Sequence, residues 1–84
     1  MTSGFPVENI LLDRASGTNL HRQIYRQLRD LIERRVLPSG SALPSTRVLA
    51  KDLGIGRNTV IAAYEQLALE GFLDMAHGTP PVVT

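Results

Sequence analysis

The sequence predicts a mainly α fold with a small β-hairpin at its C-terminal end. Three observations predict it: apolar residues recur with helical spacing from Leu20, only "GIG" separates the next two helical segments, and two short β-prone segments, 72–75 and 82–84, follow. The chain has 84 residues, which suits one small domain with a modest core. We expect an N-terminal arm over residues 1–19 and a folded domain over residues 20–84.

The composition excludes several classes of protein. The chain has no cysteine, which excludes a disulfide framework and a cysteine-ligated zinc site and agrees with a cytoplasmic location. No apolar run is long enough to cross a bilayer, and the N-terminus lacks the pattern of a secretory signal, so we expect no membrane partner. The sequence also lacks paired carboxylates, a glycine-rich phosphate loop and a metal-ligand cluster, so we expect neither an enzyme nor a metal site.

The formal net charge of +1 is too small to indicate nucleic acid by itself, and the charge is unevenly distributed. Five arginines accompany two acidic residues between Leu20 and Val36, whereas three basic and four acidic residues lie between Ala42 and the end. Any binding of DNA by the second half must therefore depend on individually placed side chains.

Apolar spacing and capping residues define the first two helices. Apolar residues at positions 20, 24, 28, 31 and 32 predict an amphipathic helix over residues 20–36, with Asn19 as a candidate cap. Ser45 is a candidate N-cap for a second helix over residues 46–53, and Gly54 is suited to end that helix.

A third helix, expected over residues 57–70, follows the second after only three residues. A short turn between two helices that meet at a steep angle is the helix-turn-helix unit. This unit needs a small residue where the helices cross, a residue that tolerates positive φ in the turn, and a buried branched residue in its second helix. Ala50, Gly54 and Val60 meet these requirements at the required spacing. An ordinary helical hairpin without a ligand is the alternative.

Helical spacing divides the third helix into two faces. The inner face carries the residues expected in the core: Val60, Ala63, Tyr64 and Leu67. The outer face carries Asn58, Ala62, Glu65 and Leu69, of which Leu69 is expected to pack under the hairpin or the arm. Asparagine can contact adenine through two hydrogen bonds, and arginine can contact guanine. An arginine at a helix N-terminus also opposes the helix dipole, so Arg57 and Asn58 are candidates for DNA contacts.

Several stretches, "LHRQIYRQLRDLI", "LPSTRVLAKDLGIGRNTVIAAYEQLALEGFL" and "HGTPP", together resemble the winged helix-turn-helix of GntR-type bacterial regulators. "LLDR" before the first helix and "RNTVIAAYEQL" in the third resemble the MocR-type subfamily most closely. The resemblance covers nearly the whole chain from about Ile10. It implies a three-helix winged domain that binds double-stranded operator DNA in transcription regulation.

The resemblance also implies where the DNA contacts lie. The helix over residues 57–70 would enter the major groove, and the tip of the hairpin, near residues 77–79, would approach the minor groove. The matching residues lie at the start of the second helix, at the start of the third helix and at the hairpin tip: Ser45, Thr46, Arg47, Arg57, Asn58, Thr59, His77, Gly78 and Thr79.

Some positions depart from the family pattern. Gly56 stands where many relatives carry a serine or threonine cap, Ile61 stands where several carry a basic residue, and Pro80 and Pro81 cannot donate to a β-ladder. MocR-type proteins also carry an aminotransferase-like domain that binds pyridoxal phosphate. Nothing in this sequence matches that domain, and the single lysine, Lys51, lies inside the DNA-binding unit, so we expect no cofactor in this chain.

Each candidate residue has a structural alternative. Asn58 can cap its own helix, Thr59 can bond to the local backbone, and Arg47 can pair with Asp74 or Glu70. The alternative function is a winged-helix protein-interaction module without DNA binding, which would present an apolar outer face on the third helix. A homodimer of this fragment is expected to be weak.

Overall fold

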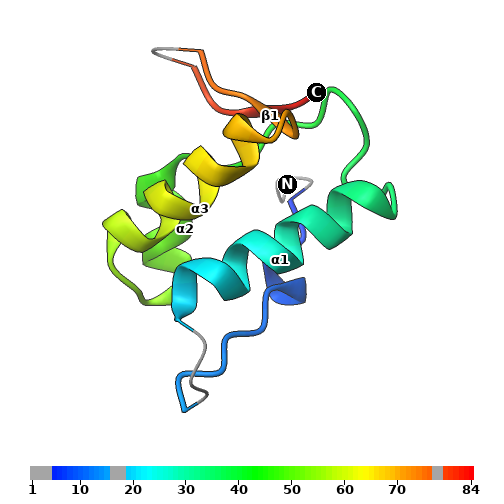
Figure 1. Cartoon of the computed structure of the whole chain (residues 1–84). Helices are drawn as coiled ribbons and strands as arrows, with labels where there is room; N and C mark the ends of the chain where they lie inside the picture. The colour runs from blue at the N-terminus through cyan, green and yellow to red at the C-terminus, as the bar shows by residue number, and fades with distance from the viewer. Residues whose placement is uncertain (1–4, 16–18, 77–78) are drawn as a thin grey trace.

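The computed structural model describes residues 5–15, 19–76 and 79–84. In this part of the chain, a short 3-10 turn precedes three α-helices and an antiparallel pair of strands, which confirms the predicted fold (Figure 1). In chain order the elements are η1 Val7–Asn9, α1 Leu20–Glu33, α2 Thr46–Leu53, α3 Arg57–Leu69, β1 Leu73–Asp74 and β2 Val82–Val83. Across the described residues, no helix has the length and the apolar character that crossing a bilayer requires.

The core lies where α3 packs between α1 and α2 (Figure 1). All four residues predicted for the inner face of α3 are buried, and Tyr64 has no exposed surface. The buried apolar side chains of the described residues form one cluster: Ile10, Ile24, Leu28, Leu31, Leu37, Leu43, Leu49, Ala50, Val60, Ala63, Tyr64, Leu67, Leu73 and Val83. Because Ile10 belongs to this cluster, residues ahead of α1 also pack on the helices.

The first helix ends earlier than the sequence predicts. It was expected to reach Val36, but α1 ends at Glu33 and Arg35 takes a left-handed backbone conformation, with φ of 60°. A longer helix would place Arg35 on the buried side, one helical turn beyond the last core residue of α1. The chain turns instead, and Leu37 enters the core with 3% of its surface exposed. Packing therefore overrides the helical continuation.

The helix-turn-helix forms as predicted. The Ser45 hydroxyl accepts a hydrogen bond from the backbone N–H of Val48 at 3.2 Å and so caps α2. Gly54 ends α2 in the left-handed conformation with φ of 68°, and the N–H of Ile55 reaches back to the carbonyl of Ala50 at 3.0 Å. This is a Schellman-type helix end, which turns the chain sharply into α3.

The hairpin is shorter than predicted. The strands were expected over 72–75 and 82–84, but the paired residues are Leu73 with Val83 and Asp74 with Val82. The prolines limit β2 because they cannot donate hydrogen bonds. The Pro81 carbonyl still accepts a bond from the Leu43 N–H at 2.8 Å, so the loop before α2 lies along the free edge of β2.

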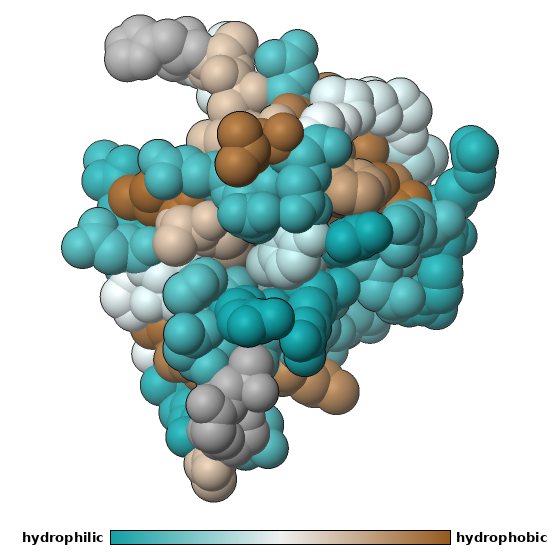
Figure 2. Space-filling view, in the orientation of Figure 1, coloured by the Kyte–Doolittle hydropathy of each residue, from teal (hydrophilic) through white to brown (hydrophobic). Residues whose placement is uncertain are grey.

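The outer face of α3 departs from the prediction at one position. Leu69 was expected to pack under the hairpin or the arm, but it is 82% exposed. It borders a hollow of about 880 Å³ between α1 and α3, which is otherwise lined mainly by polar and charged side chains. Figure 2 shows that the surface over α1 is mostly hydrophilic, with scattered hydrophobic side chains.

Candidate nucleic-acid interface

The fold brings the starts of α2 and α3 together. The Nε of Arg57 donates a hydrogen bond to the hydroxyl oxygen of Thr46 at 3.0 Å, across eleven positions of the chain. Both residues stand at the first position of their helices, where backbone N–H groups are unpaired within the helix. Two of the three groups of predicted contact residues therefore lie side by side.

At the start of α2, Ser45 and Thr46 hold defined hydrogen bonds while Arg47 does not. The hydroxyls of Ser45 and Thr46 both act as acceptors in these bonds, so each keeps its own proton to donate. Arg47 is exposed, and no hydrogen bond or ion pair joins it to another described residue. The alternative in which Arg47 pairs with Asp74 or Glu70 is therefore wrong for the part of the chain that the structure describes.

The start of α3 has no side-chain cap. Gly56 occupies the N-cap position with an extended backbone, and no capping side chain bonds to the first turn within the described residues. Asn58 is exposed and makes no hydrogen bond to a described residue, so the alternative in which it caps α3 is not seen. Thr59 is half-buried, and its N–H reaches the Gly56 carbonyl at 3.2 Å. The exposed polar groups of this turn are thus available to a ligand.

The hairpin also lies close to the start of α2. His77 and Gly78 lie outside the described residues, whereas Thr79 is exposed and its hydroxyl donates to the Ala76 carbonyl at 3.2 Å. A hollow of about 370 Å³ separates the hairpin from α2 and is lined by Ser45, Thr46, Met75, Thr79, Pro80 and Pro81. Met75, which directly follows β1, was not among the predicted site residues, and the sequence around it carries no motif that would have identified it.

Tyr64 connects α3 to the residue that precedes the α2 cap. Its ring is fully buried, and its hydroxyl donates to the Pro44 carbonyl at 2.8 Å. Burial raises the pKa of Tyr64, because the charged phenolate would be poorly solvated there. Tyr64 therefore acts as a neutral donor that fixes the start of α2 relative to α3.

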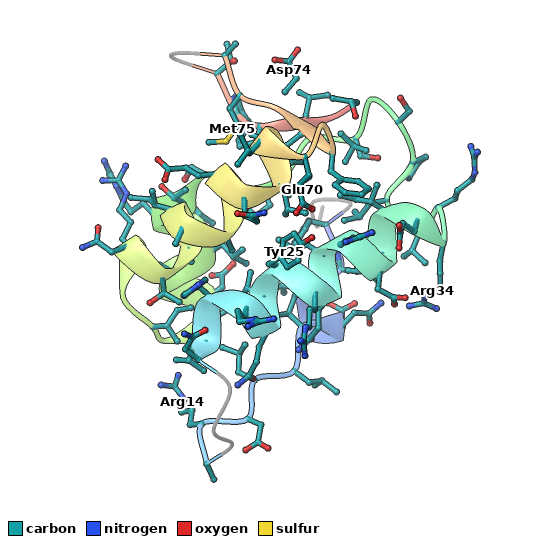
Figure 3. The ribbon with its side chains drawn as sticks, in the orientation of Figure 1. Arg14, Tyr25, Arg34, Glu70, Asp74 and Met75 are labelled. Carbon is teal, nitrogen blue, oxygen red and sulfur yellow. The ribbon has the colours of Figure 1, made fainter. Side chains whose placement is uncertain are left out.

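The far end of α3 is tied to α1 instead. The hydroxyl of Tyr25 donates to the Glu70 carboxylate, and Figure 3 shows these two side chains pointing toward one another from α1 and from the end of α3. Hydrogen bonds from Tyr25 and Gln66, with the charge of Arg29 nearby, lower the pKa of Glu70. This acidic side chain is thus occupied by α1, away from the helix starts.

The comparisons with known proteins agree with this architecture. Residues 20–83 match the family model described as bacterial regulatory proteins of the gntR family. The chain is 43% identical over 70 residues to the probable rhizopine catabolism regulatory protein MocR of Rhizobium meliloti. It is 41% identical over 70 residues to the HTH-type pyridoxine biosynthesis transcriptional regulator PdxR of Corynebacterium glutamicum. Each match covers 83% of this chain, but only 14% of MocR and 16% of PdxR.

A solved structure shows the same fold over most of its length. YtrA from Sulfolobus acidocaldarius, a GntR-family transcription factor, matches with a TM-score of 0.83 and 38% sequence identity, covering 90% of this chain and 80% of YtrA. The matched family consists of regulators rather than enzymes, as the sequence predicts. The chain therefore belongs to the GntR family of bacterial regulatory proteins, as the winged helix-turn-helix DNA-binding domain of a transcription regulator.

Proposed function

We propose that the starts of α2 and α3 form one DNA-binding surface and that α3 enters the major groove by its N-terminal end. The observation that carries this proposal is the hydrogen bond between Arg57 and Thr46, because it places the two helix starts on one face. The exposed side chains of Arg47 and Asn58, which have no partner among the described residues, support it. Such free, polar helix starts are where helix-turn-helix proteins contact DNA.

The residues of this surface have different proposed roles. Ser45 and Thr46 donate their hydroxyl protons to phosphate oxygens, and Arg47 contacts phosphate through its charge. Arg57 opposes the dipole of α3, and a phosphate at the helix start removes this unfavourable interaction. Asn58 contacts the edge of a base, with adenine as its preferred partner.

Thr59 and the hairpin tip complete the proposed surface. Thr59 contacts phosphate close to Asn58, through a side chain that is half-buried on α3. His77, Gly78 and Thr79 approach the minor groove, and the hydroxyl of Thr79 donates to the carbonyl of Ala76 within the described part of the hairpin.

Two substitutions test this surface. A DNA duplex is first enriched from a random-sequence pool by the parent protein, and a scrambled duplex serves as the comparison. Asn58→Ala should weaken binding to the enriched duplex by about 1–3 kcal/mol and have little effect on the scrambled one. Arg57→Ala should weaken binding to both and reduce the salt dependence of binding by about one unit, because it removes a phosphate contact.

Arg34→Ala is the matched control for charge. Arg34 lies at the opposite end of the molecule from the start of α3 and pairs only with Asp30 among the described residues (Figure 3). Removing it should leave both affinities within about twofold, because exposed ion pairs contribute little and distant charges are screened. Melting curves should show all three variants folded, with only a small loss of stability in Arg57→Ala, which loses its exposed bond to Thr46. If folded Asn58→Ala and Arg57→Ala bind like the parent, α3 does not enter the groove by its N-terminal end.

We also propose that two copies of the domain act together on DNA. Two domains on half-sites about one helical turn apart would bury both recognition helices in successive major grooves. The isolated domain should then bind a single half-site only weakly, with a Kd on the order of micromolar or above. Sedimentation with duplexes that carry one or two half-sites measures whether a second copy binds.

Leu69 favours a second candidate function. Its 82% exposure on the outer face of α3 suits a contact with another protein. In that case the folded domain would enrich no duplex from the pool. The substitutions of Arg57 and Asn58 would then have no effect on the binding of any duplex. The polar character of the α3 start favours DNA over this alternative.

A further inference from the structure

The residues "LLDR", at positions 11–14, lie ahead of the helix-turn-helix and take no part in the proposed DNA surface. Residues 10–14, here called the strap, run along α1 and are joined to it by two glutamines. The side-chain amide of Gln27 accepts from the N–H of Leu11 and donates to its carbonyl, both at 2.6 Å. The amide of Gln23 makes the same pair of bonds with Asp13, at 2.8 and 2.9 Å.

The spacing of these bonds explains why two glutamines suffice. Residues two apart in an extended strand are about 6.6 Å apart, and residues four apart on a helix rise by about 6.0 Å. The side-chain amides of Gln23 and Gln27 therefore present a donor and an acceptor at nearly the spacing of backbone groups along a β-strand. The strap bonds to them as it would to a neighbouring strand. The alternate strap residues point the other way: Ile10 is buried in the core and Leu12 packs against it.

The strap ends at the turn between α2 and α3. The Nη2 of Arg14 donates to the carbonyl of Leu53 at 3.2 Å and to the carbonyl of Gly54 at 3.0 Å. These carbonyls belong to the last residue of α2 and to the glycine that follows it, where helical backbone acceptors lack partners. A cation at a helix C-terminus also interacts favourably with the helix dipole. Figure 3 shows Arg14 near the start of α1, on the side of the strap.

We propose that Arg14 is a positioning residue that holds the α2–α3 turn and thereby the orientation of α3. The strap is anchored to α1 by Gln23 and Gln27, so Arg14 couples the turn to the first helix over about forty residues of sequence. Arg14 acts through the backbone of the turn and need not touch DNA. The consequence for DNA binding rests on the proposed function, whereas the effect on the turn does not.

Hydrogen exchange of the free protein tests the effect on the turn. Arg14→Ala should speed exchange of the Ile55 amide, whose N–H closes the end of α2 on Ala50, by about three- to tenfold. Amides in the middle of α1 should keep the rates of the parent. Arg26→Ala removes an exposed arginine of α1 that has no partner among the described residues, so this charge-matched control should change neither set.

Two further variants separate the contact from the charge. Arg14→Lys should restore slow exchange at Ile55, because a single nitrogen makes both bonds and an ammonium group has enough donors. Gln27→Ala leaves Arg14 in place but releases the strap at Leu11, and it should speed exchange at Ile55 by a smaller factor. It also serves as the test if Arg14→Ala does not fold.

DNA binding tests the consequence for α3. With the enriched and scrambled duplexes described above, Arg14→Ala should weaken binding to the enriched duplex by about three- to tenfold more than binding to the scrambled one. The salt dependence should stay that of the parent. A direct contact of Arg14 with phosphate would instead weaken both duplexes alike and reduce the salt dependence by about one unit.

The outcomes are distinct. Unchanged exchange at Ile55 in folded Arg14→Ala overturns the proposal whatever happens to DNA binding. Faster exchange with unchanged discrimination between the two duplexes shows that the turn does not position α3 and also overturns it. If the parent enriches no duplex, the proposed function fails, while the exchange rates still decide whether Arg14 holds the turn.

Discussion

The starts of α2 and α3 lie side by side, yet they are stabilised in opposite ways. The start of α2 is satisfied locally, because Ser45 caps it. The start of α3 has glycine at its N-cap and takes its contacts from elsewhere in the chain, through Arg57 to Thr46 and, about two turns further on, through Tyr64 to Pro44. The helix that we propose to contact bases is thus the one whose first turn is left open to a ligand.

The largest effect on this arrangement should come from the bond between Tyr64 and Pro44. Tyr64→Phe keeps the buried ring but leaves the Pro44 carbonyl without its donor, so the free energy of unfolding should fall by about 1–3 kcal/mol. Denaturant titration measures this change. Tyr25→Phe is the matched control, since it removes a hydroxyl that bonds to Glu70 at the surface, and its effect should be clearly smaller. If Tyr64→Phe and Tyr25→Phe lowered the free energy of unfolding equally, the two helix starts would not be held together through the core.

The cap of α2 should have the next largest effect. Ser45→Ala removes the hydroxyl that accepts from Val48 and should lower the free energy of unfolding by about 1 kcal/mol. Ser45→Asp keeps a capping oxygen and should retain the stability, but its negative charge should weaken binding to both enriched and scrambled duplexes. If Ser45→Ala melts like the parent, α2 does not depend on its cap and the contrast between the two helix starts is lost.

Supplying the missing cap of α3 should have the smallest effect. The backbone of Gly56 already has the extended conformation of an N-cap, with φ of −68°, and a side chain there would have space, since the nearest atom lies 4.0 Å from its Cβ. Gly56→Ser should therefore raise the free energy of unfolding by a few tenths of a kcal/mol, roughly the difference between serine and glycine caps. Gly56→Ala restricts the backbone of the unfolded chain as serine does, but it supplies no capping oxygen. It should not give this gain, because alanine is a poor N-cap residue. A destabilised serine variant would contradict the view that this start only lacks a cap.

Much of the fold could be predicted from the sequence because its signals are local. The apolar spacing of α3 identified all four of its buried residues, and Ser45 and Gly54 marked the ends of α2 where the structure has them. The end of α1 could not be predicted this way. The helical propensity of residues 34–36 favours continuation, but the need to bury Leu37 and to keep Arg35 out of the core ends the helix at Glu33.

The candidate site was predictable in part. The family pattern identified the positions of Arg47, Arg57 and Asn58, whose roles in DNA binding remain predictions. It could not show that Arg57 bonds to Thr46, because that contact depends on the angle at which the two helices meet. It also could not show that Met75, just after β1, lines the hollow at the start of α2, since the sequence around it carries no motif.

The sequence by itself therefore determined the helices, the turn between α2 and α3 and the family, because capping, helical periodicity and the conformational freedom of glycine act over a few residues. Only the tertiary structure decided the contacts of the segment ahead of α1. Arg14 and the carbonyls of the α2–α3 turn are separated by about forty residues, and the two glutamines that hold the strap are spaced like any polar pair on a helix. Their partners become visible only when the strap lies along α1, because hydrogen bonds between distant segments depend on packing and leave no local pattern.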